Sequence, residues 1–138
     1  MIVIVAIDDK GDMLFNGRRQ SKDRVLCEDV LTMTRNSRLW MNAYSAKQFE
    51  NHNGENIKQC EDFLDSAAAE EYCFVENASL NPYEHKIEKI VLYKWNRVYP
   101  GDKFFDINLS DGKWHMSSVS EFQGFSHEKI SKEIWDRC

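Results

Sequence analysis

The sequence contains few of the residues that mark specialised classes of protein. Its 138 residues include only two prolines and six glycines, too few for a collagen-like or low-complexity chain. No apolar run approaches the roughly 20 residues that a membrane-spanning helix needs, so no membrane partner is expected. The N-terminal apolar run, Ile2–Ile7, is too short for a signal peptide and has no basic region before it. A cytoplasmic protein is therefore expected.

The sequence also lacks the spacings of a metal site. Its four cysteines form no CxxC pair, and no histidine lies at zinc-finger spacing from any of them. An HxHxDH run is absent too, which disfavours a zinc hydrolase of the metallo-β-lactamase type. We therefore expect no metal, and we expect the thiols of a cytoplasmic chain to be reduced.

A net positive charge is missing as well. The formal net charge is −5, so no global basic field attracts nucleic acid, and a nucleic-acid partner is not expected. Any site for an anion must then be local. The length and the apolar fraction of 42% are typical of one globular domain, residues 1–138.

What is present is a series of short apolar segments. Ile2–Ile7 is a continuous apolar run, mostly β-branched, which is typical of a strand buried on both faces. The same pattern predicts further buried strands at 38–42, 72–75 and 89–95, and a terminal antiparallel pair at 114–119 and 129–135. Helices are predicted at 22–34, capped by Ser21, and at 43–50 and 61–71. This order predicts an α/β fold with a mostly parallel central sheet, helices on both faces and an antiparallel C-terminal edge.

A local anion site is predicted in the basic segment 17–24, which directly precedes the first predicted helix. A guanidinium group is a planar fork that suits phosphate or carboxylate, and the N–H groups of a helix N-terminus add to its charge. We expect the segment to bind a small anion or a nucleotide through Arg18, Arg19, Gln20, Ser21 and Arg24. The alternative is a solvated loop whose charges pair with acids such as Glu28.

Five polar side chains follow two of the predicted buried strands. The carboxyl ends of parallel strands meet at one edge of a sheet, where open α/β sheets bind ligands. We therefore expect a crevice shared with the basic segment and lined by Asn42, Tyr44, Ser45, Glu76 and Asn77. The alternative is that the two asparagines cap helices and that Glu76 is exposed.

Three side chains are candidates for acid–base chemistry. His127 lies beside Glu128 at the start of the last predicted strand, and a histidine next to acids can act as a general acid or base. A solvated turn histidine is the alternative. Asp23 and Glu28 lie near the start of the first predicted helix. A metal-free ribonuclease that uses arginine, His127 and an acid stays open, as does a homodimer through an exposed Trp95 or Tyr99.

The order of these segments, together with three stretches, resembles dihydrofolate reductase. IVAIDDKGDMLFNGRRQS, residues 4–21, is similar to the family's first strand and the mobile loop over its substrate. LWMNAYSAKQF, residues 39–49, lies where the family has an apolar strand, Met-Gly-Arg and a helix. The C-terminal half of the family is similar to three further stretches of this chain, which are residues 90–107 (IVLYKWNRVYPGDKFFDI), 114–122 and 126–137. The chain also resembles small bacterial proteins that sometimes carry a ribonuclease label.

The resemblance departs from the family where its nicotinamide cofactor binds. The family's Met-Gly-Arg is here Met41, Asn42 and Ala43, and its Gly-Gly after a central strand is here Glu76 and Asn77. Glycine lets the backbone approach a pyrophosphate, whereas a carboxylate repels it. The resemblance thus implies a kept fold without the reductase apparatus, and no cofactor is expected.

Three functions remain open at this point. The first is a protein that binds a small anionic or nucleotide ligand without folate reductase activity. The second is a diverged NADPH-dependent reductase of a pterin-like substrate. The acidic residue with which the family binds the pterin falls near Leu26 by counting, so the nearby Asp23 or Glu28 would have to supply the acid. The third is a protein-interaction module.

Overall fold

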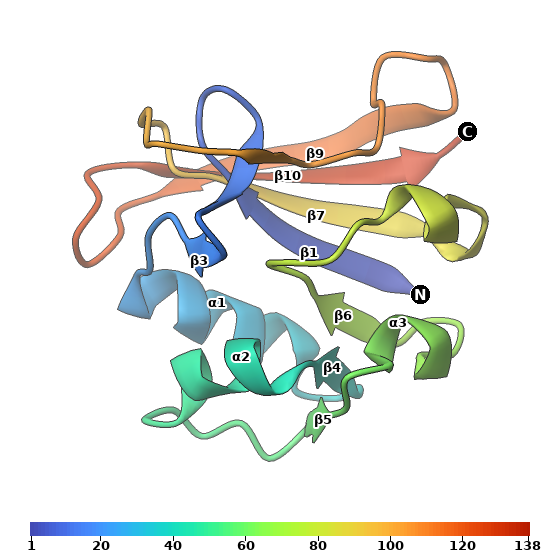
Figure 1. Cartoon of the computed structure of the whole chain (residues 1–138), viewed down its shortest axis with the longest axis horizontal. Coiled ribbons are helices and arrows are strands. Elements are labelled where there is room, and N and C mark those ends of the chain that lie inside the picture. Colours follow the sequence, from blue (N-terminus) through green and yellow to red (C-terminus); the bar gives the residue numbers. More distant parts are fainter.

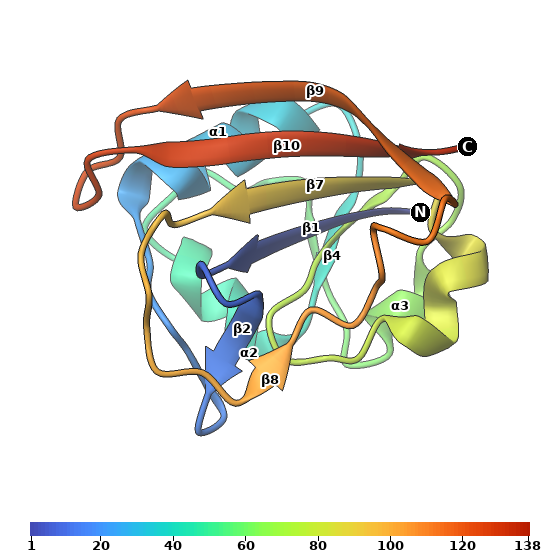
Figure 2. The same cartoon turned by 90° about the horizontal axis from the view of Figure 1, so that it is seen from above.

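The central sheet of the protein has seven strands, and β1 lies in its middle. The computed structural model describes residues 1–138 (Figures 1 and 2). The strand order is β5-β4-β6-β1-β7-β10-β9. The strands β5, β4, β6, β1 and β7 run parallel to one another. Strands β10 and β9 extend the sheet at the β7 edge in antiparallel orientation. The bounds are β1 Ile2–Ile7, β4 Leu39–Met41, β5 Ile57–Gln59, β6 Tyr72–Phe74, β7 Lys89–Lys94, β9 Trp114–Phe122 and β10 Ile130–Arg137.

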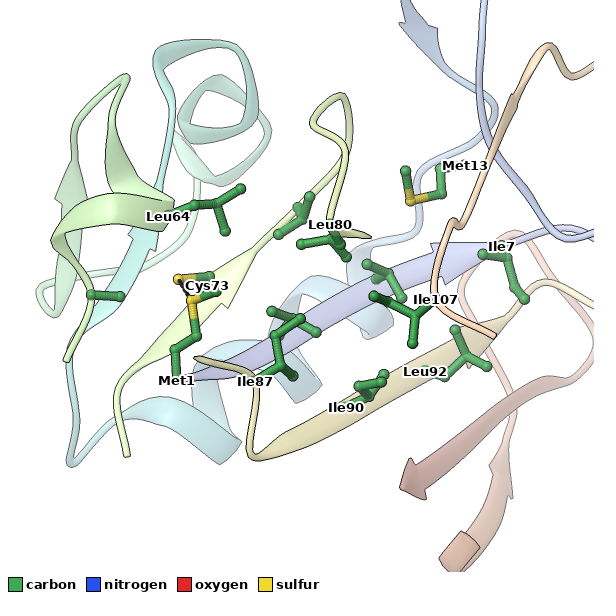
Figure 3. Close-up of a cluster of buried hydrophobic side chains, with 14 of the residues drawn as sticks. Met1, Ile7, Met13, Leu64, Cys73, Leu80, Ile87, Ile90, Leu92 and Ile107 are labelled. Carbon is green, nitrogen blue, oxygen red and sulfur yellow. Dashed lines mark hydrogen bonds between the residues drawn. The ribbon is translucent and has the colours of Figure 1, made fainter. Parts of the chain in front are cut away.

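Strand β1 is central because its side chains supply both faces of the sheet. Successive side chains of a strand point to opposite faces. Val3 and Val5 accordingly join one buried cluster, and Ile2 and Ile4 join another. Figure 3 shows the first cluster, in which Ile90 and Leu92 of β7 lie beside β1. The predicted strand and its burial on both faces are confirmed.

Helical segments cover both faces of the sheet, as predicted. On the face of Ile4 lie α1 (Arg24–Thr34) and, after α2 (Ala43–Ala46), the 3₁₀ turn η1 (Lys47–Phe49). The other face is covered by α3 (Phe63–Ser66) and the 3₁₀ turn η2 (Asn81–Lys86). None of these helices is long and apolar enough to cross a membrane.

A small antiparallel sheet carries the basic segment. Its order is β3-β2-β8, with bounds β2 Asp12–Phe15, β3 Arg18–Arg19 and β8 Lys103–Phe104. Met13 and Leu14 are buried and anchor this sheet in the first cluster. Strand β3 pairs with β2 after a tight turn, and this pairing places Arg19 at the edge of the central sheet.

The predicted helix at 61–71 is wrong beyond its first turn. The structure has only α3, and Ala67 after it is extended, with φ −66° and ψ 136°. Glu70 has a φ of 66°, a left-handed conformation that no helix accepts. The Glu71 carboxylate accepts the N–H of Ala68 at 2.8 Å, so a side chain replaces the helical carbonyl as the partner.

The predicted start of the first helix is also wrong by two residues. Helix α1 begins at Arg24, and its N-cap is Asp23, whose Oδ1 accepts the N–H of Val25 at 2.9 Å. Ser21 is therefore not the cap. Its hydroxyl bonds elsewhere, which changes its role in the site described below.

Candidate functional site

Polar side chains from two strands meet at the carboxyl edge of the parallel sheet. Asn42 follows β4, and its Nδ2 donates to Oδ1 of Asn77, which follows β6, at 2.8 Å. Asn42 also caps α2, because its Oδ1 accepts the N–H of Ser45 at 3.0 Å. Asn42 therefore meets Asn77 at the edge of the sheet, as expected, and it also caps a helix, as the alternative proposed.

The basic segment contributes Arg19 to this edge. The Nε and Nη2 atoms of Arg19 donate to the two carboxylate oxygens of Glu76 at 2.8 and 3.0 Å. Ser45 donates its hydroxyl to the same carboxylate at 2.8 Å. The guanidinium stacks on Tyr44, with its carbon 4.4 Å from the ring centre, and the Tyr44 hydroxyl accepts the N–H of Arg19. Glu76 is thus buried in an ion pair, contrary to the alternative that it is exposed.

Burial and pairing act in opposite directions on Arg19. Loss of water disfavours its charged form, but the hydrogen bonds and the charge of Glu76 outweigh this and raise the pKa of Arg19. The guanidinium is therefore permanently charged and already satisfied by a carboxylate. Arg19 closes the edge of the sheet, with its charge paired to Glu76.

Two other predicted ligands in this segment differ in position. Gln20 lines a small cavity at the edge together with Arg19 and Glu76, whereas Arg18 does not. Arg18 is exposed and lines an open depression of about 300 Å³, which Arg19 and Gln20 also line. Gln20 donates its Nε2 to the carbonyl of Pro100 at 3.1 Å, which ties the segment to the turn after β7. Its Oε1 is buried and has no hydrogen-bond partner.

An open cleft of about 450 Å³ lies beside the N-terminus of α1. It is lined by Lys22, Asp23, Arg24, Cys27, Gln48, Asn51, His52, Phe125 and Ser126. The Arg24 guanidinium lies over the Phe125 ring, 4.3 Å from its centre. Burial raises the pKa of Cys27 to about 11, so its thiol stays protonated and is not a reactive group of the cleft.

Asp23 accepts more hydrogen bonds than any other carboxylate of the site. Besides the cap to Val25, Oδ1 accepts the N–H of Phe125 and Oδ2 that of Ser126, both at 2.9 Å. Nδ1 of His127 lies 2.8 Å from Oδ2. Burial would raise the pKa of Asp23, but these donors together hold it far below its ordinary value. Asp23 is therefore ionised and fixed.

The other ring nitrogen of His127 contacts two hydroxyl groups. Nε2 lies 3.0 Å from Oγ of Ser21 and 2.9 Å from the hydroxyl of Tyr99. The ring is 3% exposed and stacks on Trp95, with 4.6 Å between the ring centres. Trp95 is itself buried, so the expectation that it is exposed is wrong, whereas Tyr99 is half-buried.

The three acid–base candidates do not form one group. Asp23 and His127 are bonded to each other, whereas Glu28 is exposed and pairs with Arg24 at 3.6 Å. The sequence indicates His127 and Ser21 separately and carries no signal that joins them. Residues 106 positions apart share no periodicity, and the N-cap predicted at Ser21 is in fact Asp23.

Comparisons with known proteins identify the fold through structure and not through sequence. No protein-family model and no curated protein matches the chain. A solved structure of dihydrofolate reductase from Enterococcus faecalis, in complex with NADP(H) and RAB-propyl, matches with a TM-score of 0.68. The match covers 99% of this chain and 95% of that chain at 12% sequence identity. This chain has a dihydrofolate reductase-like fold.

The predicted resemblance is thereby confirmed for the fold. The dihydrofolate reductase-like sheet accounts for the central β1, the parallel strands and the antiparallel β10 and β9. At 12% identity the likeness carries the architecture and leaves the chemistry to the side chains.

Proposed function

We propose that this protein binds a small anionic ligand, such as a nucleotide, in the cleft beside α1 and does not reduce folate. The observation that carries the proposal is the pairing of cationic and aromatic groups there. The cationic Lys22 and Arg24 line the cleft together with His52 and the aromatic ring of Phe125. A volume of about 450 Å³ is within the range of sites for small molecules.

The charges of the cleft are available to a ligand. Lys22 forms no ion pair, and Arg24 has only Glu28 at 3.6 Å, where both side chains are more than half exposed. Such a surface pair is worth only about 0.3–0.5 kcal/mol, so a phosphate can replace the carboxylate at little cost. The one carboxylate that lines the cleft, Asp23, is already satisfied by its own donors.

Phe125 favours a ligand with a planar part. Its side chain is 66% exposed, which is unusual for a phenylalanine, and it lies on the loop that Asp23 holds. Stacking of a base on an aromatic ring is worth about 1–3 kcal/mol and tolerates any base. A ligand whose planar ring stacks on Phe125 and whose phosphate lies near Lys22 would use both the aromatic and the cationic groups of the cleft.

The proposal excludes folate reduction because the edge of the sheet does not suit a dinucleotide. Where the family has Gly-Gly, Glu76 has a buried carboxylate paired with Arg19. Where the family has a glycine after Met, Asn42 has a side chain bonded to Asn77. A pyrophosphate there would meet the Glu76 carboxylate and the hydrogen-bonded amides of Asn42 and Asn77, so the residues at this edge do not fit a nicotinamide cofactor.

The experiment is calorimetric titration with adenosine and guanosine monophosphates, inorganic phosphate and NADPH. We expect a monophosphate to bind saturably, and Lys22→Ala/Arg24→Ala to weaken binding at least 10-fold, since a charge-assisted hydrogen bond contributes about 1.5–3 kcal/mol. Arg35→Ala/Lys58→Ala removes two exposed cations from the far end of α1 and from β5, and it should change affinity less than 2-fold. Tight NADPH binding followed by dihydrofolate turnover would refute the proposal.

A further inference from the structure

Ser21, His127 and Asp23 are linked by two hydrogen bonds in series. Oγ of Ser21 lies 3.0 Å from Nε2 of His127, and Nδ1 of the same ring lies 2.8 Å from Oδ2 of Asp23. The same two contacts join nucleophile, base and orienting acid in serine hydrolases on unrelated folds. We infer that these three residues form a nucleophilic site that hydrolyses small acyl esters.

The environment of His127 sets its tautomer. Asp23 is ionised and can only accept, so Nδ1 donates to its Oδ2, and in the neutral ring the lone pair of Nε2 then faces the hydroxyls. Burial and stacking on Trp95 keep the ring in this orientation. Nε2 is then a base placed to take the proton of Ser21.

Donors for a developing oxyanion lie next to the nucleophile. The backbone N–H groups of Ser21 and Lys22 donate to no acceptor within the protein. The Tyr99 hydroxyl lies 2.9 Å from Nε2 and 3.4 Å from Oγ of Ser21. Because Nε2 has a single lone pair for the Ser21 hydroxyl, Tyr99 donates instead to Oγ of Ser21, and once Oγ is acylated the Tyr99 hydroxyl becomes available to the oxyanion.

The hydrolytic step balances with water as the only co-reactant. Oγ of Ser21 forms a bond to the ester carbonyl carbon, and its proton moves to Nε2 of His127. The bond from carbon to the leaving oxygen then breaks, and the leaving alcohol takes the proton from Nε2. Water next attacks the acyl-Ser21 ester with Nε2 as base, which releases the acid and returns the proton to Oγ.

The space at Ser21 limits the acyl group. The cavity that Ser21 lines with Gln20 and Gln48 is about 10 Å³, which is room for a single water-sized group. An acetyl methyl is close to this size, whereas a larger leaving group would lie outside this cavity; Gln48 lines both the cavity and the cleft beside α1. The expected substrates are therefore acetyl esters of larger alcohols.

Anchoring of the loop after β9 does not require Ser21. Asp23 already holds that loop through the N–H groups of Phe125 and Ser126. The contact of Ser21 with Nε2 comes in addition to this anchor, from a half-buried residue of another segment. A test that removes only the Ser21 hydroxyl therefore separates catalysis from anchoring.

The first experiment measures hydrolysis of p-nitrophenyl acetate and labelling by a fluorophosphonate. We expect one phosphonyl adduct, on the Ser21 peptide, and a loss of at least 100-fold in kcat/KM in Ser21→Ala. Ser110→Ala, in an exposed turn, should retain full activity and labelling. An absent adduct, an adduct that persists in Ser21→Ala, or an adduct on Tyr99 would overturn the inference.

A second measurement leaves His127 and Asp23 in place, because both also hold the loop after β9. The Ser21→Cys protein is alkylated with iodoacetamide across pH, and the peptide that contains the substituted position is followed by mass. An imidazole-paired thiol reacts as thiolate well below the free-thiol pKa of about 8.5. A rate that stays level down to about pH 6 supports the inference, and a rate that follows an ordinary thiol contradicts it.

Discussion

The ion pair between Arg19 and Glu76 offers the sharpest test of how the site is held. In Glu76→Gln the carboxylate is lost while its shape and the bond from Ser45 are kept. The Arg19 side chain, 21% exposed, is then left without its counter-charge against a Glu76 position that is 9% exposed. Breaking a fully buried pair costs about 3–5 kcal/mol, and the partial exposure of Arg19 reduces this to about 2–3 kcal/mol.

The matched control is a solvent-exposed ion pair of the same chain. Lys129 and Glu121 are 3.2 Å apart with side chains 59% and 53% exposed, so Glu121→Gln should cost less than about 1 kcal/mol. Urea unfolding followed by tryptophan fluorescence measures both. The double variant Arg19→Met/Glu76→Leu should recover most of the loss, because it removes both charges. If Glu76→Gln costs no more than Glu121→Gln, the pair does not hold the segment.

Three further predictions concern groups with perturbed pKa values. The pKa of Asp23 is lower in the folded than in the unfolded chain, so the ionised carboxylate stabilises the fold above about pH 3.9 and this stabilisation is lost as pH falls below that value. In Asp23→Asn the free energy of unfolding should therefore fall less steeply with decreasing pH. Burial holds the pKa of Cys27 near 11, so at pH 8 a thiol reagent should modify exposed Cys138 quickly and Cys27 only on unfolding. Tyr93 donates to Asp29 from the core, and Tyr93→Phe should destabilise by about 1–2 kcal/mol in the same urea assay.

Much of the fold could be predicted because hydrophobic patterning determines it. Ile2–Ile7 is apolar at every position, and only a central strand buries both of its faces. The helix predicted at 61–71 failed because its inward alanines supply little burial, and the side chain of Glu71 competes for the backbone. Local periodicity cannot register such a competition.

The site could be predicted only where topology alone brings residues together. Asn42 and Asn77 follow neighbouring parallel strands, so their meeting follows from the sheet. Asp23 and His127 are 104 residues apart and meet because a hairpin loop folds back on a helix N-terminus. No pattern in the sequence encodes the length or course of that loop, and the pairing of Arg19 with Glu76 depends on β3 in the same way.

The segment from Arg19 to Asp23 is tied at both ends, and this bears on how the cleft would bind. Arg19 is fixed to Glu76 after β6, and Asp23 is fixed to the loop that contains Phe125. Lys22 lies between these anchors, so little backbone entropy remains to be lost when a ligand contacts it. Loosening either anchor should therefore weaken anion binding even though neither Glu76 nor the N–H of Phe125 need touch the anion. Affinity in this cleft would depend on the rigidity of the segment as much as on its charge.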